Sequence, residues 1–573
     1  MMNSFSTPSI VRRAARATVL VAALGALGGV ASTKAPHFYP DDPIAREPES
    51  QDASNAQRYE IGSLYEMTHN LFVIAGYKPT GVRAQSINTI DEVADSSWFT
   101  NRIGTVPVTV DEITRGPNRS APPDPSKWVL MREKSSGSHP GFTARDGKDE
   151  TWFLEFDPTY FAEGATGAVA VATKIFWAFG YNQVETFLTT FDPKNVEIDP
   201  KATARRPSGA RTPYTRDDMS AILENVARKP DGSYRAVAGR LIPGKILGGF
   251  QYDGTRPDDP NDVVPHEHRR ELRALRVFGA WTNLTDLKAQ NTIDTLITEN
   301  GRSIVKHVLQ DVGSTFGMCN DLHEWDLSWE HFYQTDTTMK RLFSFGFALS
   351  PWQTVDYVER PSLGKFEGDR FDPRTWRPQT PTTAYLELRD DDAFWAARRV
   401  GAFTDDLIKA AVHTGEYTDP QTEKDLVEIL IKRRNKILSI YLTAVNPIVS
   451  PKLDANGRLT FENAAFAAGV ASGSATYRAA WLRFDNATGE TQPIAETQAT
   501  TTTIDAPRGL PTAAGSYIAA DLSVESEGHP TWRKPVRTYF HREGNGWKLV
   551  GLERLPETST PNATRSANAS TRR

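Results

Sequence analysis

The most informative stretch is Thr285-Asp-Leu-Lys-Ala-Gln-Asn-Thr-Ile-Asp-Thr-Leu-Ile-Thr-Glu-Asn-Gly-Arg-Ser-Ile-Val-Lys-His-Val-Leu-Gln-Asp-Val-Gly-Ser, which ends at Ser314. It predicts the end of a helix, a polar loop, a strand, an Asn300-Gly301 turn, a second strand and a loop that begins at Asp311. A two-residue turn joins antiparallel strands. The hairpin therefore brings Asn291 and Asp311 together at one end.

Asp286, Asn291 and Asp311 are residue types that phosphoryl transfer uses together. A carboxylate accepts or orients the attacking hydroxyl, while an amide oxygen and a second carboxylate hold Mg²⁺ against the phosphates. In chain order, Asp286 is the candidate base, and Asn291 and Asp311 are the candidate metal ligands. The alternative is an ordinary surface hairpin in which these side chains serve as turn and cap residues.

This segment resembles the catalytic half of the protein-kinase-like superfamily, whose catalytic loop runs Asp-x-x-x-x-Asn and whose metal-binding loop begins Asp-Phe-Gly. Asp286 and Asn291 have that spacing, Lys288 matches the loop lysine, and Asp311 opens the motif Asp-Val-Gly. The resemblance covers residues 128–445. It implies a two-lobed core that uses Mg²⁺ or Mn²⁺ and ATP. It also implies that Asp286 and Lys288 are catalytic, and that Asn291 and Asp311 bind the metal and the nucleotide.

Three positions depart from the family pattern. Leu284 stands where a histidine or tyrosine usually precedes the catalytic aspartate, which removes a packing contact but no reacting group. Glu155 occupies the strand position of the usual phosphate-binding lysine, and Val169 occupies the helix position of that lysine's glutamate partner. A carboxylate in place of the lysine repels a triphosphate unless a cation intervenes, so catalysis by the standard route is expected to suffer.

Nearby lysines leave several alternatives open for Glu155. Lys174, further along the same helix, could form a reversed ion pair with it, or both could be separate surface charges. Alternatively, Lys134 or Lys148 could reach the phosphates. The Ser/Gly-rich turn at 135–141 could cover a nucleotide, but it lacks the regular glycine spacing of the family.

Residues 126–250 have the composition of a β-rich N-terminal lobe with one main helix. The segment from Thr166 to Gly180 has helical length, an apolar face and a glycine where a C-terminal cap belongs. β-branched and aromatic residues predict strands at 128–132, 151–156, 185–191 and 234–242.

Residues 251–445 are expected to form a larger helical lobe that contains the catalytic loop. Its first helix, at about 266–282, carries apolar residues at helical spacing. The same helix carries arginines that we expect on an exposed face, balanced by three nearby aspartates. These residues are Arg269, Arg270, Arg273 and Arg276, with Asp258, Asp259 and Asp262.

The two ends of the chain differ from this core. Residues 1–35 predict a secretory signal peptide, with three arginines before a short apolar stretch and small residues at the cleavage region. Residues 36–125 are expected to be an N-terminal lead-in segment. Residues 446–557 alternate like the strands of a small all-β domain, and residues 558–573 have the composition of a disordered tail.

Composition excludes several classes of protein. The chain has 66 basic and 71 acidic residues, and loss of the three signal arginines would leave 63 against 71, a net charge near −8. This balance argues against a nucleic-acid partner. The only cysteine, Cys319, cannot form an internal disulfide. No segment after the signal has the length and apolarity of a membrane span.

The sequence therefore predicts an α+β fold, a two-lobed protein-kinase-like core followed by a small all-β domain. Two functions are compatible with it. One is an exported Mg-nucleotide-dependent phosphotransferase with a protein, glycan or small-molecule substrate. The other is a catalytically inactive, pseudokinase-like binding or scaffold protein of the cell envelope.

Overall fold

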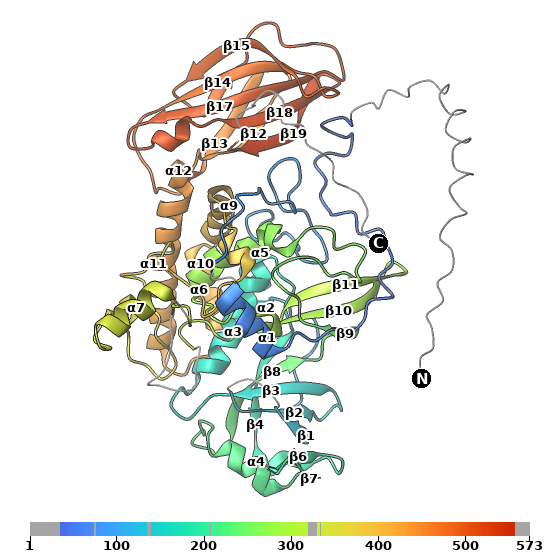
Figure 1. The fold of residues 1–573 in the computed structure, drawn as a ribbon, viewed down its shortest axis with the longest axis vertical. Coiled ribbons are helices and arrows are strands. Elements are labelled where there is room, and N and C mark those ends of the chain that lie inside the picture. Colours follow the sequence, from blue (N-terminus) through green and yellow to red (C-terminus); the bar gives the residue numbers. More distant parts are fainter. Residues whose placement is uncertain are drawn as a thin grey trace, which may run out of the picture.

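Three parts of the molecule follow one another along its long axis (Figure 1). The computed structural model describes residues 35–73, 76–134, 139–206, 208–318, 329–332 and 334–555. A sheet at one end is followed by a middle part, in which a three-stranded sheet lies beside a group of helices, and then by a β domain at the other end. The expected signal peptide, Cys319 and the expected tail lie outside the described residues.

The first lobe is a six-stranded sheet in the order β4-β8-β3-β2-β1-β5, against which helix α3 packs. The helix, Gly164–Phe179, ends at Gly180, whose φ of 130° favours glycine and whose missing side chain makes room for Phe99. The predicted helix and the four predicted strands are confirmed. The strands are β1 Trp128–Glu133, β2 Gly141–Arg145, β3 Thr151–Phe156, β4 Thr186–Phe191, β5 Val196–Ile198 and β8 Tyr234–Arg240, with η3 Pro193–Asn195, β6 Thr203–Arg205, β7 Arg211–Pro213 and α4 Arg216–Leu223 between β4 and β8.

Alternation along β3 decides which of its side chains face the middle of the molecule. Trp152, Leu154 and Phe156 are buried in the core of the first lobe. Successive side chains of a strand point to opposite faces, so Phe153 and Glu155 project from the other face. That face lines a cleft between the sheet and the hairpin of residues 292–309.

The predicted hairpin is confirmed in position and register. Strand β10, Thr292–Glu299, pairs with β11, Arg302–Leu309, from Thr292↔Leu309 to Glu299↔Arg302. Asn300 and Gly301 form the turn with φ of 49° and 77°, the signs that this type of two-residue turn requires. Strand β9, Lys245–Gly248, completes the sheet.

The predicted helix at 266–282 is broken into short pieces, and one expectation about it is wrong. The pieces are η4 His266–His268, α5 Arg270–Arg273 and α6 Leu275–Thr282. Arg269, Arg270 and Arg273 are buried, whereas the sequence predicted an exposed arginine face. Arg270 pairs instead with Asp91 and Asp392, which are 179 and 122 residues away. Partners so distant in sequence cannot be recognised from the local charge pattern.

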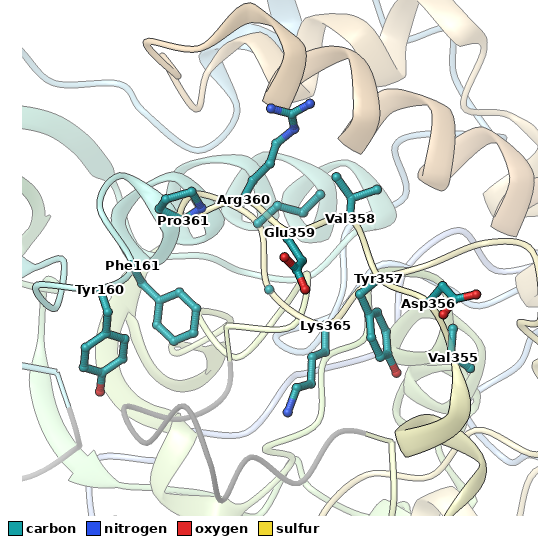
Figure 2. Close-up of a pocket in the computed structure, with 12 residues that line it drawn as sticks. Tyr160, Phe161, Val355, Asp356, Tyr357, Val358, Glu359, Arg360, Pro361 and Lys365 are labelled. Carbon is teal, nitrogen blue, oxygen red and sulfur yellow. The ribbon is translucent and has the colours of Figure 1, made fainter.

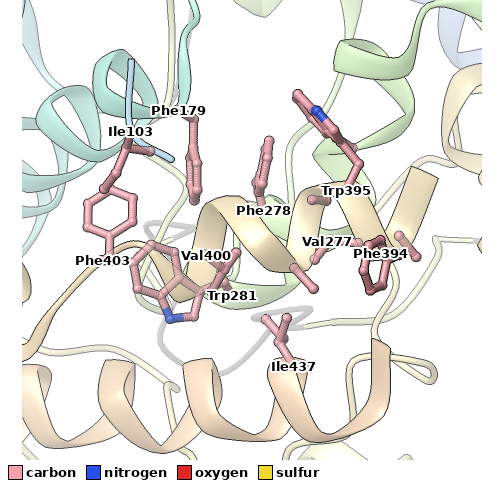
Figure 3. Close-up of a cluster of buried hydrophobic side chains, with 14 of the residues drawn as sticks. Ile103, Phe179, Val277, Phe278, Trp281, Phe394, Trp395, Val400, Phe403 and Ile437 are labelled. Atoms are coloured by element: carbon pink, nitrogen blue, oxygen red, sulfur yellow. The ribbon is translucent and has the colours of Figure 1, made fainter. Parts of the chain in front are cut away.

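The middle part is built on aromatic packing between α6 and the helices that follow (Figure 3). Phe278 stacks on Phe179 of α3 with ring centroids 3.8 Å apart, and Trp281 lies 4.9 Å from Phe403. These contacts join the first lobe to the second. The helices are α7 Thr335–Phe343, η6 Pro351–Thr354, α8 Thr383–Leu386, α9 Asp390–Gly401, α10 Asp405–His413 and α11 Pro420–Ala444. None of the helices within the described ranges combines the length and apolar character of a membrane span.

The last part is a β domain of two sheets, with strand orders β12-β13-β16 and β15-β14-β17-β18-β19. Its strands are β12 Ile448–Leu453, β13 Arg458–Asn463, β14 Ala475–Phe484, β15 Thr491–Ala499, β16 Thr503–Asp505, β17 Tyr517–Ser526, β18 Val536–Glu543 and β19 Gly546–Arg554, with α12 Ala464–Ala467 and η7 Pro530–Arg533. The α+β fold with a two-lobed core and a following all-β domain is thus confirmed.

The segment before the first lobe packs against the second. It contains α1 Ser63–Thr68, the π-helical turn η1 His69–Val73 and α2 Val110–Arg115. Trp98 stacks on His307 of β11 with ring centroids 3.5 Å apart. The lead-in residues therefore contribute to the core of the second lobe.

Candidate active site

Contacts to two later segments of the chain hold the polar loop after α6. Asn283 ends the helix in a left-handed conformation with φ of 59°, and its Oδ1 accepts a hydrogen bond from Trp376 Nε1 at 2.9 Å. The backbone N–H of Asp286 donates to Ser314 Oγ at 3.1 Å. The loop is thus fixed between Trp376 and the segment that follows Asp311.

Asn291 links the other predicted site residues. Its Nδ2 donates to Asp286 O at 2.8 Å, and its backbone oxygen accepts from the N–H groups of Gln310 and Asp311, both at 3.0 Å. Lys288 Nζ lies 2.7 Å from Asp286 Oδ2. Because Asn291 uses its amide nitrogen as a donor, its Oδ1 remains as an acceptor. All four predicted residues are therefore brought together.

Asp311 is exposed and lines the cleft. Its Oδ1 accepts a hydrogen bond from Gly313 N–H at 2.9 Å. Desolvation and the nearby charge of Glu155 raise its pKa above the ordinary value, although the Gly313 hydrogen bond and Lys134 oppose this. Gly313 lies against the helix, because a Cβ at this position would be 3.0 Å from Val169 Cγ2. Val169 thus lies next to the loop that begins at Asp311.

Glu155 forms an ion pair that the sequence did not predict, with Lys134. Lys134 Nζ lies 2.7 Å from Glu155 Oε1. Desolvation disfavours the charge on Glu155, but Lys134 outweighs it and lowers the pKa of the carboxyl. The reversed pair with Lys174 is wrong, because Lys174 is buried and its Nζ has no hydrogen-bond partner among the described residues. Lys148 is exposed in the turn between β2 and β3.

A cleft of about 260 Å³ separates the sheet of the first lobe from the hairpin. Glu155 and Asp311 line it together with Arg240 and Gln310. The rest of its wall is mainly apolar and includes Phe153, Val184, Val237, Ile242, Ile246 and Ile293. An apolar cleft with a few charged groups suits a ligand that has a flat ring and a charged tail.

The donors at Asn291 and Asp311 fit a divalent cation. Both residues offer hard oxygen atoms, and Mg²⁺ is usually bound by one or two protein carboxylates together with substrate phosphates. Across the described ranges, no group of three or more His, Cys, Asp or Glu side chains could hold a metal by itself. Phosphate oxygens would therefore have to complete the coordination.

Glu66 is a site residue that the sequence did not indicate. Its Oε1 accepts a hydrogen bond from Ala289 N–H at 2.6 Å, so helix α1 is attached directly to the polar loop that carries Asp286 and Asn291. Desolvation raises the pKa of Glu66, and the charge of Asp286 adds to this while Lys288 opposes it. No motif surrounds Glu66 in the sequence. Only the path of the chain along β9 brings it to this loop.

A second, larger hollow of about 590 Å³ lies beyond the metal-binding loop, next to the start of α3. Figure 2 shows Phe161, Glu359 and Lys365 turned toward the same space. Its wall contains Gly364, whose N–H donates to Phe316 O at 3.2 Å. The hollow therefore adjoins the segment that begins at Asp311, and its mixed aromatic and charged lining differs from that of the apolar cleft.

No protein-family model and no curated protein sequence matches this chain. Among solved structures, a crystal structure of the Golgi casein kinase aligns at 11% identity with a TM-score of 0.28, covering 70% of this chain and 96% of that chain. A crystal structure of the Golgi casein kinase with Mn/ADP bound aligns at 12% identity with a TM-score of 0.27 and the same coverage. TM-scores this low do not establish a common fold, so the assignment of function rests on the residues themselves.

Proposed function

We propose that this chain is an exported, kinase-like phosphotransferase that uses ATP and Mg²⁺ or Mn²⁺. The observation that carries the proposal is the bridging position of Asn291. Its backbone oxygen binds the N–H of Asp311, and its side chain binds the carbonyl of Asp286. One residue thus fixes a candidate base and a candidate metal ligand relative to each other beside an apolar cleft.

Each predicted residue has a distinct role in the proposed reaction. As the acceptor oxygen attacks the terminal phosphorus, Asp286 accepts the hydroxyl proton. The bond from that phosphorus to the bridging oxygen then breaks, and the nucleoside diphosphate leaves. Lys288 orients the Asp286 carboxylate through their 2.7 Å contact. Asn291 and Asp311 hold the divalent cation, which when bound offsets the charge of the phosphates.

A binding or scaffold protein of the cell envelope is the second candidate function. Glu155 and Val169 favour it, because a kinase-like site normally has a lysine and a glutamate at these positions. The acceptor of the phosphotransferase is a protein, a glycan or a small molecule, since the net negative charge disfavours nucleic acid.

Thermal unfolding distinguishes the two functions. A ligand that binds only the folded state raises the unfolding midpoint. We expect millimolar ATP with Mg²⁺ or Mn²⁺ to raise the midpoint of the purified protein, and Asp311→Ala to abolish the rise. Asp356→Ala is the matched control, because Asp356 is an exposed carboxylate of the second hollow.

The outcomes have separate meanings. A metal-dependent rise that is retained in Asp356→Ala and lost in Asp311→Ala supports the phosphotransferase. The absence of any rise in the unaltered protein overturns it and favours the scaffold function. Export is tested separately, by expressing the full chain in a bacterial host and locating it in the periplasm or medium with a shortened N-terminus.

A further inference from the structure

Lys134, Gly141 and Glu155 form one row across three neighbouring strands. Lys134 N donates to Gly141 O at 2.8 Å, and Gly141 of β2 is the register partner of Glu155 of β3. Directly opposed residues of antiparallel strands project from the same face. Lys134 and Glu155 therefore share the face that lines the cleft, with Gly141 between them.

The missing side chain at Gly141 makes this row possible. A Cβ at position 141 would lie 3.1 Å from Lys134 Cδ and 2.4 Å from Leu154 O. Strands are about 4.8 Å apart, so β1 and β3 are separated by about 9.6 Å. The aliphatic chain of Lys134 crosses β2 over Gly141, which has no side chain, and its Nζ lies 2.7 Å from Glu155 Oε1. The ammonium of Lys134, which follows β1, is thus brought next to the carboxylate of Glu155 on β3.

Lys134 is the cation in the described structure whose charge acts on both Glu155 and Asp311. Other cations near the cleft have different partners. Arg240, which also lines the cleft, contacts Glu150 at 3.2 Å and Glu185 at 4.0 Å. Of these two cations, Lys134 is therefore the one whose carboxylate partner, Glu155, lines the cleft with Asp311.

We infer that Lys134 binds the nucleotide phosphates in this cleft and that Glu155 is the positioning residue that holds its ammonium beside Asp311. This inference rests on the proposed function. The usual pair has its lysine on strand β3 and its acid on helix α3. Here the acid, Glu155, lies on β3, and the lysine, Lys134, extends from the end of β1. Lys134 and Glu155, packed across Gly141, then replace the lysine–glutamate pair that a kinase-like site normally has at positions 155 and 169.

The test compares ATP with adenosine, which has the same ring system but no phosphates. Binding of each to the full protein is measured by calorimetric titration, with Mg²⁺ present and absent. We expect Lys134→Met to weaken ATP binding about 10- to 100-fold, the effect of removing a hydrogen bond to a charged group, and to leave adenosine binding unchanged. Lys148→Met, at an exposed lysine of the same lobe, is the matched control and should bind ATP normally.

A charge exchange tests the positioning role of Glu155. The double variant K134E/E155K keeps an ion pair across Gly141 but places the lysine on β3, so we expect it to recover ATP binding relative to Lys134→Met. Equal ATP affinity in Lys134→Met and the unaltered protein would overturn the inference, as would an equal loss of adenosine binding. If the unaltered protein binds no ATP at all, the proposed function fails first, which distinguishes the two failures.

Discussion

Two groups of charged side chains in this molecule are built in opposite ways. At α5, Arg270 is fully enclosed and contacts Asp91 and Asp392, both at 2.9 Å. Beside the cleft, Lys134 contacts Glu155 at 2.7 Å, and 26% of its side chain is exposed. Its charge also acts on Asp311 by lowering the pKa of that carboxyl. In the first group Arg83 and Arg273 also contact the two aspartates, at 2.7 and 3.0 Å, so the carboxylates are compensated within the protein. In the second group one lysine, open to solvent, acts on two carboxylates. Uncompensated charge in a cleft indicates a ligand-binding site, whereas compensated buried charge indicates a structural role.

The protonation behaviour of the carboxylates follows the same division. Burial alone would raise the pKa of Asp91, but Arg270 and Arg83 lower it to about 2. Desolvation and Glu155 raise the pKa of Asp311, and Lys134 does not reverse this. Within the cleft the two carboxylates differ, because Lys134 lowers the pKa of Glu155 but does not offset the desolvation of Asp311. The arginine cluster thus favours Asp91 as an anion, whereas desolvation at the cleft disfavours the anionic form of Asp311.

Arg270→Met gives the largest expected loss of stability. It would leave Asp91 and Asp392 as buried carboxylates without their main partner, a change that costs about 3–5 kcal/mol. Urea unfolding of the purified protein measures the loss. Arg276→Met is the matched control on the following helix, because Arg276 is only partly buried and should cost about 1 kcal/mol or less. Equal losses in the two variants would contradict the contrast between the groups.

Lys174→Met is expected to stabilise the protein, because Lys174 is a third kind of charge, buried without a hydrogen-bond partner among the described residues. Desolvation lowers its pKa from 10.5 to about 8, although Glu185 opposes the shift. Below pH 8 the folded protein must hold a buried ammonium, at a cost of roughly 3 kcal/mol at neutral pH.

The pH dependence of this gain gives a sharper test. Between pH 8 and 10.5 the unfolded chain keeps the Lys174 proton while the folded protein releases it, so folding of the unaltered protein improves as pH rises. The advantage of Lys174→Met should therefore be largest below pH 8 and nearly vanish by pH 10.5. Unfolding midpoints across this range measure it, and a gain that does not change with pH would refute the assignment.

Lys134→Met is expected to have the smallest effect on stability, a loss of less than about 1 kcal/mol, because a partly exposed ion pair contributes little to folding. Urea unfolding of this variant without nucleotide measures the loss. A loss as large as that of Arg270→Met would mean that Lys134 is a structural residue like the arginines. The comparison between the two groups would then fail.

Local patterns predicted most of the core. The alternation of Trp152, Leu154 and Phe156 gave β3, and the Asn300-Gly301 turn gave the hairpin and its register, because both signals lie within a few residues. The buried arginines were misjudged for the opposite reason. Arg270 meets Asp91 and Asp392 only after the chain has folded.

The candidate site likewise contains residues that the sequence predicted and one that it did not. Asp286, Lys288, Asn291 and Asp311 could be found together because one loop and one hairpin connect them. Glu66 reaches the catalytic loop from a segment more than 200 residues earlier, through a hydrogen bond to Ala289 N–H. Neither a motif nor a periodicity marked it.

The sequence by itself determined the order of the elements and the meeting of Asn291 with Asp311, because a strand period and a two-residue turn are properties of short segments. Only the tertiary structure decided which lysine joins Glu155. That choice depends on three strands lying side by side and on Gly141 being bare between them. Contacts across a sheet are set by the register of distant strands, and the sequence near each residue does not contain that register.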